Sequence, residues 1–287
     1  MVFLLSLGSA ALYGAADFLG GIASRRTNTI AVVFLSQLAG MVLLVAILPL
    51  LPAATPLTDD LAWGGVAGLA GGTGVALLYR ALAVGRMAVV APTTAVCAVA
   101  IPVMAALLLG ERPAPLTLGG IAVAVVAIVL VSRQAASGGT QGGPSQGGSP
   151  LPPGLRLALL SGVAIGFFFL ALARTAPAAG LWPLLVARAV SVAFFGLAAA
   201  FGRRSLRMAG PVAATVIGAG VIDMLANALY LVATRHGPLS VVVTLSSLYP
   251  ASTVVLAWLV LGERLTAWQC AGIVCALAAV ALIVGGG

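Results

Sequence analysis

Long apolar runs, each about the length of a membrane-spanning helix, fill the chain from end to end and are separated by short breaks. A helix needs about 20 consecutive apolar residues to cross a bilayer. The runs are continuous and do not alternate with polar residues, so they do not suit strands. The pattern therefore predicts an all-α polytopic membrane protein with ten transmembrane helices. The predicted helices cover residues 2–24, 29–51, 61–83, 87–109, 115–132, 154–173, 179–201, 209–234, 238–261 and 266–284.

One stretch differs from all the others in composition. Residues 133–153 read RQAASGGTQGGPSQGGSPLPP, and such a Gly-, Ser- and Pro-rich sequence neither buries a core nor crosses lipid. We interpret it as a flexible linker. It divides the chain into residues 1–132 and residues 154–287, with five predicted helices in each part.

The two parts share sequence. LLLGER at 107–112 returns as LVLGER at 259–264, which is 152 residues later. Because each part has an odd number of helices, the second copy must enter the membrane from the opposite side. The sequence thus predicts two inverted five-helix repeats, an architecture of secondary transporters, with both chain termini on one side of the membrane.

The repeated GER phrase has two interpretations. Gly110 and Gly262 fall where predicted helices end, a position that favours glycine. Glu111 and Glu263 can then pair locally or lie near the N-terminus of the next helix, which is a structural role. Alternatively, the two glutamates are gating residues at the two mouths of a transport path.

The composition excludes several classes of protein. The chain is 62% apolar and 7% charged, whereas soluble domains carry about 25% charged residues. The net charge of +8 comes from 14 scattered arginines with no lysine, so it favours loops that orient the chain in a membrane over a nucleic-acid patch.

Sequence motifs for nucleotide or metal chemistry are absent. There is no P-loop, no G-x-G-x-x-G and no H-E-x-x-H, and His236 is the single histidine. The cysteines Cys97, Cys270 and Cys275 lie in apolar runs, where small buried hydrophobic residues are expected. We therefore expect no cofactor, no metal, no ATP-driven pump and no enzyme activity.

Three ionisable residues lie inside predicted spans, and such residues are functional hypotheses by default. They are Asp17, Arg188 and Asp223. Asn227 and Tyr230 continue the helix face of Asp223, and this stripe could bind an ammonium group or relay a proton. Alternatively, Asp223 pairs with Arg188 and locks two neighbouring helices. For Asp17 we expect a place in a cavity, and we predict that at least one of the two carboxyl groups carries a coupling proton.

The repeat alignment adds an aromatic surface to the candidate site. Residues 15–17 (Ala-Ala-Asp) align with residues 167–169 (Phe-Phe-Phe). If these turns face each other across a cavity, Phe168 is a candidate for substrate binding on the aromatic side, and Tyr13 lies one turn from Asp17 on the acidic side. A small acidic wall opposite an aromatic wall suits an amine with an apolar body, such as a large neutral amino acid. Alternatively, the phenylalanines are ordinary packing or lipid-facing residues.

Prolines interrupt two predicted helices that correspond to each other in the repeats. Pro92 and Pro102 lie in the fourth and Pro250 in the ninth, where each removes a backbone hydrogen bond and can kink the helix. Interrupted helices at matching positions point to a transport site. Ser246 and Tyr249 beside Pro250 are therefore candidate substrate ligands; alternatively, the hydroxyls near it bond to their own helix.

The third predicted span carries Gly64, Gly68 and Gly72, one every four residues. Such spacing lets helices approach closely, so the stripe predicts helix packing or, alternatively, a sliding surface for alternating access. Tyr79 closes this span and is a further candidate for substrate binding.

These segments together resemble the EamA family of the drug/metabolite transporter superfamily. The resemblance rests on LLLGERPAPLTLGGIAVAVVAIVL (107–130), LVLGERLTAWQCAGIVCALAAVAL (259–282), LYRALA (78–83), ALYLVATRHGPLSVV (228–242) and Arg188. It implies proton-coupled or exchange transport of small metabolites, often amino acid efflux, and the family includes exporters of aromatic amino acids. An uncoupled channel and, less well, an intramembrane aspartyl enzyme remain the alternatives.

The membrane orientation stays open. With a cytoplasmic N-terminus, the cytoplasmic loops would hold Arg112, Arg174 and Arg235, and most of the other arginines would lie outside. The positive-inside rule prefers the reverse, whereas the family resemblance implies an N-terminus inside. We expect a monomer in a bacterial inner membrane, with the lipid bilayer and a small-molecule substrate as its partners and no nucleic acid.

Overall fold

The structure is a computed structural model that describes residues 1–85, 87–132, 154–261 and 267–286. The predicted linker at 133–153 and the second GER phrase, with Gly262 and Glu263, therefore lie outside the described residues.

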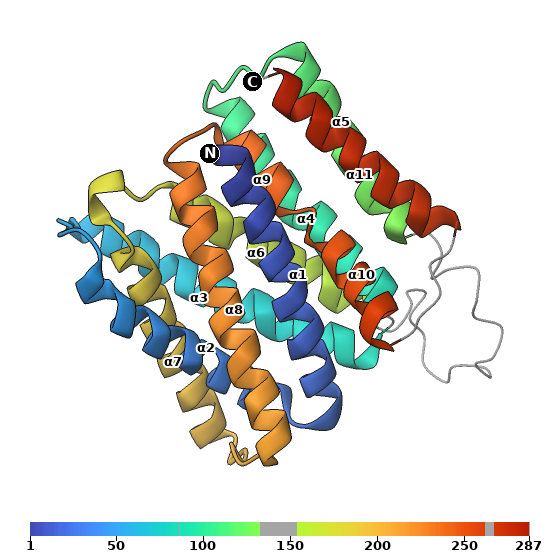
Figure 1. Cartoon of the computed structure of the whole chain (residues 1–287). Coiled ribbons are helices and arrows are strands. Elements are labelled where there is room, and N and C mark those ends of the chain that lie inside the picture. Colours follow the sequence, from blue (N-terminus) through green and yellow to red (C-terminus); the bar gives the residue numbers. More distant parts are fainter. Residues whose placement is uncertain (86, 133–153, 262–266, 287) are drawn as a thin grey trace.

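Helices account for all the regular structure in the described part of the chain (Figure 1). The first half contains α1 (Val2–Arg26), α2 (Thr29–Ile47), the short η1 (Leu48–Leu50), α3 (Thr58–Val84), α4 (Met87–Leu108) and α5 (Pro115–Ser132). The second half contains α6 (Leu155–Ala173), the short η3 (Pro177–Ala179), α7 (Trp182–Phe201), α8 (Gly210–Thr234), α9 (Leu239–Ser246), α10 (Tyr249–Leu261) and α11 (Ala267–Gly286).

The predicted apolar runs coincide with these helices, which confirms the all-helical fold class. Within the described residues, seven helical segments are long and apolar enough to cross a membrane, and shorter apolar stretches lie in α4, α5 and α11. The count of ten spanning helices stays a prediction. The ninth predicted helix is divided into α9 and α10, with Ser247 and Leu248 between them.

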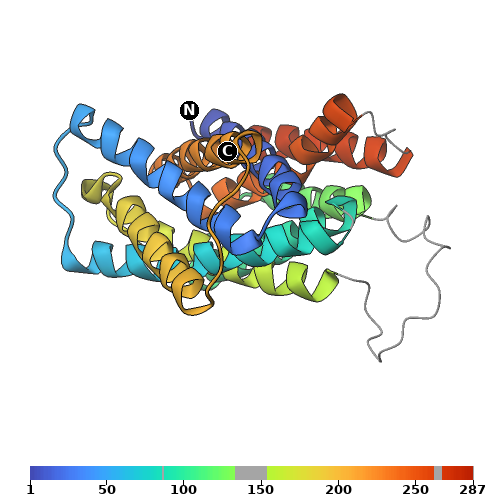
Figure 2. The ribbon, with the colours of Figure 1, turned by 90° about the horizontal axis from the view of Figure 1, so that it is seen from below.

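The helices pair in a pattern that is symmetric between the halves. Helix α1 packs against α8, and its repeat counterpart α6 packs against α3. In the same way, α3 packs against α7 and α8 packs against α2, while α5 packs against α11. Exchanging the two halves reproduces the pairing, as two copies of one unit require. Figure 1 shows α5 and α11 side by side at one edge of the bundle, and Figure 2 shows the same bundle from below.

The second copy runs in the opposite direction to the first. Met1 and Gly286 line the same shallow hollow beside His236, so both termini lie on one side, which we call the terminal face (Figure 1). Helix α1 begins there, whereas α6 begins on the opposite face, where Gly154 lies against Ala81 and Gly85 at the end of α3. The repeats are therefore inverted.

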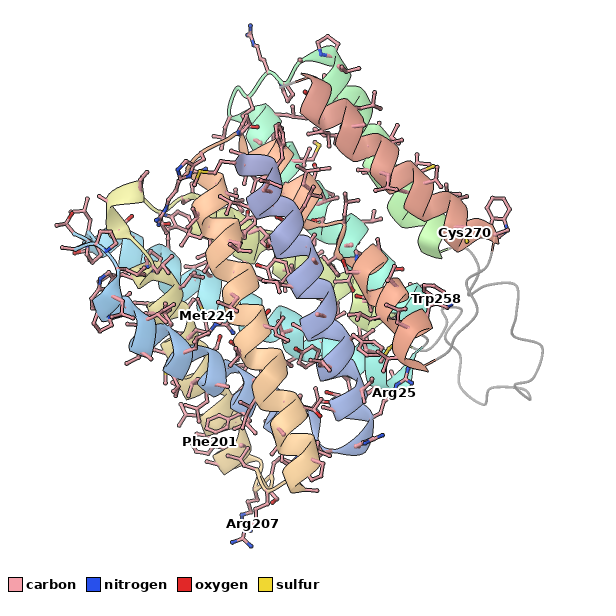
Figure 3. The ribbon with its side chains drawn as sticks, viewed as in Figure 1. Arg25, Phe201, Arg207, Met224, Trp258 and Cys270 are labelled. Carbon is pink, nitrogen blue, oxygen red and sulfur yellow. The ribbon has the colours of Figure 1, made fainter. Side chains whose placement is uncertain are left out.

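Arginines divide unequally between the two faces. Arg112 and Arg235 belong to loops at the terminal face, and Arg174 follows the end of α6 there. Figure 3 shows Arg25 and Arg207 near the other end of the bundle, away from the termini. This is the division of charge that the sequence predicts, and the positive-inside rule still favours termini outside the cell.

The glycine stripe of α3 is a packing surface. A methyl group on any of its glycines would collide with α7, because the Cβ atom would lie 2.4–2.7 Å from α7 atoms. The facing pairs are Gly64 with Pro183, Gly68 with Ala187 and Gly72 with Ser191. The equivalent crossing of α8 with α2 is tighter, since a Cβ at Gly220 would lie 2.1 Å from the carbonyl oxygen of Ser36. Close helix packing is therefore what the stripe provides.

Gly110 lies just after the end of helix α4, in the position that the sequence predicts for it. Gly110 has a φ of 96°, its N–H donates to the carbonyl of Leu107, and the N–H of Glu111 donates to the carbonyl of Ala106. This pair of bonds is a Schellman motif, whose left-handed residue is usually glycine.

Prolines act differently in the two matching helices. Helix α4 continues through Pro92 and Pro102 as one element, whereas Pro250 is the second residue of α10, directly after the break. Because proline has no N–H to donate, the last turn of α9 and the first of α10 cannot form one continuous ladder of hydrogen bonds.

Candidate functional site

A central cavity lies between the two halves. It contains about 600 Å³ of atom-free space, part of it open to solvent, and it is bordered by α1, α2, α3, α6, α7, α8 and α10. The polar residues that line it are Tyr13, Asp17, Gln37, Arg188, Ser191, Asp223, Asn227 and Tyr249. Both repeats therefore contribute to one polar site inside an apolar bundle.

An ion pair joins two helices at this cavity. Nη2 of Arg188 lies 2.5 Å from Oδ2 of Asp223, and the two side chains are 6% and 14% exposed. Nη1 of Arg188 donates to Oε1 of Gln37 on α2. The pairing of Asp223 with Arg188 that the sequence left as one alternative is therefore formed, and it links α2, α7 and α8. Removing one partner would leave an uncompensated buried charge, which is strongly destabilising.

The network continues from the ion pair to α1. Nδ2 of Asn227 donates to the backbone carbonyl of Asp223 at 2.7 Å and to its Oδ2 at 3.1 Å. Oδ1 of Asn227 accepts a hydrogen bond of 2.8 Å from the hydroxyl of Tyr13. Asp223 and Asn227 thus share a helix face, as their spacing predicts, and Tyr13 belongs to the same network.

Asp17 differs from Asp223 in having no hydrogen-bond or ion-pair partner among the described residues. It lines the cavity and is 7% exposed, yet within the described part of the chain its carboxyl group takes part in no hydrogen bond or ion pair. Among the described lining residues there are two carboxyl groups and one guanidinium, so that one acidic group has no counter-ion there. Such a group inside a membrane is characteristic of substrate pathways and proton relays.

Aromatic rings form the wall on the α6 side. Phe168 and Phe169 line the cavity, whereas Phe167 is 51% exposed and lies on the outer surface. The ring of Tyr13 meets those of Phe169 and Tyr249 edge-on, with centroids 5.9 and 6.5 Å apart. Phe168 and Phe169 thus fit the interpretation of the turn as an aromatic wall, and Phe167 fits its interpretation as an outward-facing residue.

Three predicted substrate ligands are not among the described residues that line the cavity, and they lie behind its wall. The hydroxyl of Tyr230 donates to the carbonyl of Phe169 at 3.1 Å. Tyr79 is 2% exposed and packs its ring on Gly20. Ser246 is fully buried, and its hydroxyl donates to the carbonyl of Ser6 at 3.4 Å. These residues support the wall and do not form it.

Gln37 and Ser191 are lining residues that the sequence reasoning missed. Gln37 is a lone amide in the middle of an apolar run, so the argument that selected Asp17 would have found it. Ser191 carries no comparable signal, since serine is common in membrane helices; its hydroxyl donates to the carbonyl of Gly68 at 2.6 Å.

Two inverted helical repeats around a polar central cavity define a class of protein, the membrane transporter of small solutes. The sequence model of the EamA-like transporter family matches residues 1–133 and again residues 152–285. The chain belongs to this family and is an integral membrane protein.

The fold is also that of a solved structure. The chain is similar to a protein described as "Crystal structure of protein", with a TM-score of 0.73 and 16% sequence identity over 98% of this chain and 94% of that one. No curated protein matches the chain.

Proposed function

We propose that the chain is a secondary active transporter that exports a small metabolite by alternating access between its two halves. Large neutral amino acids, including aromatic ones, are the best candidates for the substrate. The observation that carries the proposal is the central cavity, where Asp17, which has no partner within the described part of the chain, lies among aromatic rings between inverted repeats.

The lining matches the parts of such a substrate. Asp17 can accept an ammonium group, and the rings of Phe168, Phe169 and Tyr249 can contact an apolar body. A substrate carboxylate would find its donor in Arg188, in competition with Asp223, because guanidinium groups bind carboxylates through paired hydrogen bonds. The ion pair would then open as the substrate binds.

Asp17 is the proposed carrier of the coupling proton. Asp223 already has Arg188 as its counter-ion, so Asp17 is the carboxyl group that is free to exchange a proton with the cavity. Asp17→Asn should abolish flux driven by a pH gradient, while exchange of substrate continues at lower affinity because the asparagine carbonyl still accepts a hydrogen bond from the ammonium group. Unchanged gradient-driven flux in both Asp17→Asn and Asp223→Asn would refute proton coupling at this site.

One chain is proposed to be the working unit. The cavity is bordered by helices of a single chain, so a monomer has the complete site, and we place it in the inner membrane of a bacterium. The inverted repeats supply the motion, because two copies that exchange conformations open the same site first to one face and then to the other.

Counter-flow in liposomes tests the proposal. The purified chain is reconstituted into vesicles preloaded with an unlabelled amino acid, and uptake of the labelled one is followed, with nucleosides and polyamines as comparison substrates. Saturable counter-flow of a large neutral amino acid is expected. Flux that neither saturates nor shows counter-flow would favour an uncoupled channel, and counter-flow confined to another solute would replace the amino acid as substrate.

A further inference from the structure

Carboxylates of the first half hold backbone amides of the second half at the terminal face. Asp60 is the third residue of α3 and is 4% exposed. Its Oδ1 accepts a hydrogen bond of 2.7 Å from the N–H of Ala176, between α6 and α7. Its Oδ2 accepts one of 2.9 Å from the N–H of Leu57. One side chain therefore caps its own helix and holds the other repeat.

Glu111 makes a second link of the same kind. It follows the Schellman turn of α4, and its Oε1 accepts a hydrogen bond of 2.7 Å from the N–H of Leu239. Its Oε2 accepts one of 3.1 Å from the N–H of Ser240. Both amides belong to the first turn of α9, where N–H groups have no partner within the helix and attract negative charge. The carboxylate of Glu111 thus caps α9 and, by the same hydrogen bonds, joins the first half to the second. The structural and the gating interpretation of Glu111 both apply to this contact.

The loops around Asp60 strengthen the closure. The N–H of Thr55 donates to the carbonyl of Ala178 at 2.9 Å, again from the first half to the second. Nη2 of Arg235 donates to the carbonyl of Gly180 at 2.5 Å, a bond that stays within the second half. Burial lowers the pKa of Arg235, and the negative charge of Asp60 acts in the opposite direction.

The opposite face lacks the equivalents of two of these groups. Among the described residues, the third position of α8 is Val212 where α3 has Asp60, and the residue that ends α3 is Gly85 where α8 has Arg235. Glu263, the counterpart of Glu111, lies outside the described residues. The side-chain bonds of the described loops at this face stay within one half, such as the bond from Arg25 Nε to the carbonyl of Leu82 at 3.3 Å and the bond from the N–H of Arg207 to Ser205 Oγ at 3.2 Å. A bond between the halves lies further inside and joins neutral groups, from Thr94 Oγ1 to the carbonyl of Ala158 at 3.1 Å.

A hollow on the opposite face lies close to the cavity. It contains about 1080 Å³ of atom-free space between α2, α3 and α7, part of it open solvent. Its lining includes Thr73 and Phe195, next to the cavity residue Gly72. The terminal face has a hollow too, with about 870 Å³ of atom-free space beside His236. The difference between the faces therefore lies in the carboxylate–amide bonds, which tie the two halves at the terminal face.

We propose that Asp60 and Glu111 form a gate that holds the terminal face closed and makes this conformation the resting state. The proposal rests on alternating access as the proposed function. To open this face, the halves must separate and break carboxylate–amide bonds, which are stronger than neutral hydrogen bonds. The inverted repeats alone would give the two states similar energies, so these unequal contacts set the balance between them.

Spin-label distances measure the gate directly. In the full chain with its three cysteines changed to alanine, Thr58→Cys and Arg174→Cys place one exposed label on each half at the terminal face. Arg26→Cys and Arg207→Cys do the same at the opposite face. These pairs are compared in the parent, in Asp60→Asn combined with Glu111→Gln, and in Asp59→Asn. Asp59 is the matched control because it is an adjacent, exposed carboxylate with no hydrogen bond among the described residues.

The expected result is reciprocal. The double variant should raise the population with a longer terminal-face distance about tenfold relative to the parent, and the opposite-face distance should shorten in the same fraction of molecules. Asp59→Asn should resemble the parent. Asparagine keeps one acceptor oxygen for the Leu57 cap, so the start of α3 is retained.

Three results would overturn the gate: unchanged distances in the double variant, a terminal-face change without a change at the opposite face, or an equal effect of Asp59→Asn. The second result would mean that the carboxylates only cap local helix ends. Counter-flow of the parent is measured in parallel. If the parent shows no counter-flow, the proposed transport function is refuted, whatever the distances are. If counter-flow is intact and the distances are unchanged in the double variant, only the gate is refuted.

Discussion

The crossing of α2 and α8 at Gly220 gives the sharpest test of the packing. A Cβ atom at Gly220 would lie 2.1 Å from the carbonyl oxygen of Ser36 and 2.8 Å from its Cα, whereas ordinary contacts begin near 3.4 Å. Because the obstacle is backbone, Gly220→Ala would have to push the two helices apart by about 1 Å. Gly218 on the same helix is the matched control, since a Cβ there meets nothing within 4 Å.

The magnitudes separate the two variants. Each Gly→Ala change favours the helix by about 0.5–1 kcal/mol, while overpacking costs about 1–3 kcal/mol. We expect Gly220→Ala to lie about 1–3 kcal/mol below Gly218→Ala in free energy of unfolding, measured by titration with SDS in mixed micelles. Gly220 is also one turn from Asp223, and Ser36 adjoins Gln37, so the separation should disturb the Arg188 network and lower the rate of counter-flow.

The outcome that would contradict this reasoning is equal stability of Gly220→Ala and Gly218→Ala. It would mean that α2 and α8 do not cross at this distance. A destabilised Gly220→Ala with a full transport rate would leave the packing argument intact but show that the crossing does not position the network.

The remaining predictions concern the cavity. Arg188→Leu alone should destabilise the fold by about 3–5 kcal/mol, whereas Arg188→Leu with Asp223→Leu should restore stability but not counter-flow; full transport by the double variant would mean that the pair only locks helices. Phe168→Ala should raise the KM for an aromatic amino acid roughly tenfold, because about 1–2 kcal/mol of apolar contact is lost, while Phe167→Ala on the outer surface should stay within about twofold. Vesicles with Asp17→Asn should show counter-flow at pH 6 and pH 8 alike, and a pH dependence equal to that of the parent would point to another titrating group.

The sequence predicted the fold and the charged centre of the site for physical reasons. The bilayer dictates the length of each apolar run. The repeated phrase identifies two copies of a five-helix unit, and because five is odd the second copy must be inverted. Asp17, Arg188 and Asp223 were recognisable because an ionisable group is rarely placed in lipid without a function.

Other parts depended on rotation and translation of helices, which a sequence pattern does not specify. Phe167 and Phe168 are neighbours, yet one is exposed and the other lines the cavity. Tyr230 follows Asp223 by seven residues, which is about 10 Å along a helix axis, and so it passes beyond the cavity to the carbonyl of Phe169. The bonds of Asp60 and Glu111 required knowing which loops of the two halves meet.

The break between α9 and α10 has an electrostatic consequence for the cavity. It brings a helix C-terminus and a helix N-terminus together deep in the bundle, beside Tyr249, whose buried hydroxyl has no hydrogen-bond partner among the described residues. Each end carries a partial charge of about half an elementary charge, of opposite sign. The two fields cancel at a distance and act only within a few ångströms, so this part of the wall offers polarity without net charge. Unlike a carboxyl group, it keeps that polarity at every pH, and a neutral polar group of the cargo would meet the same surface whatever the protonation of the acids around it.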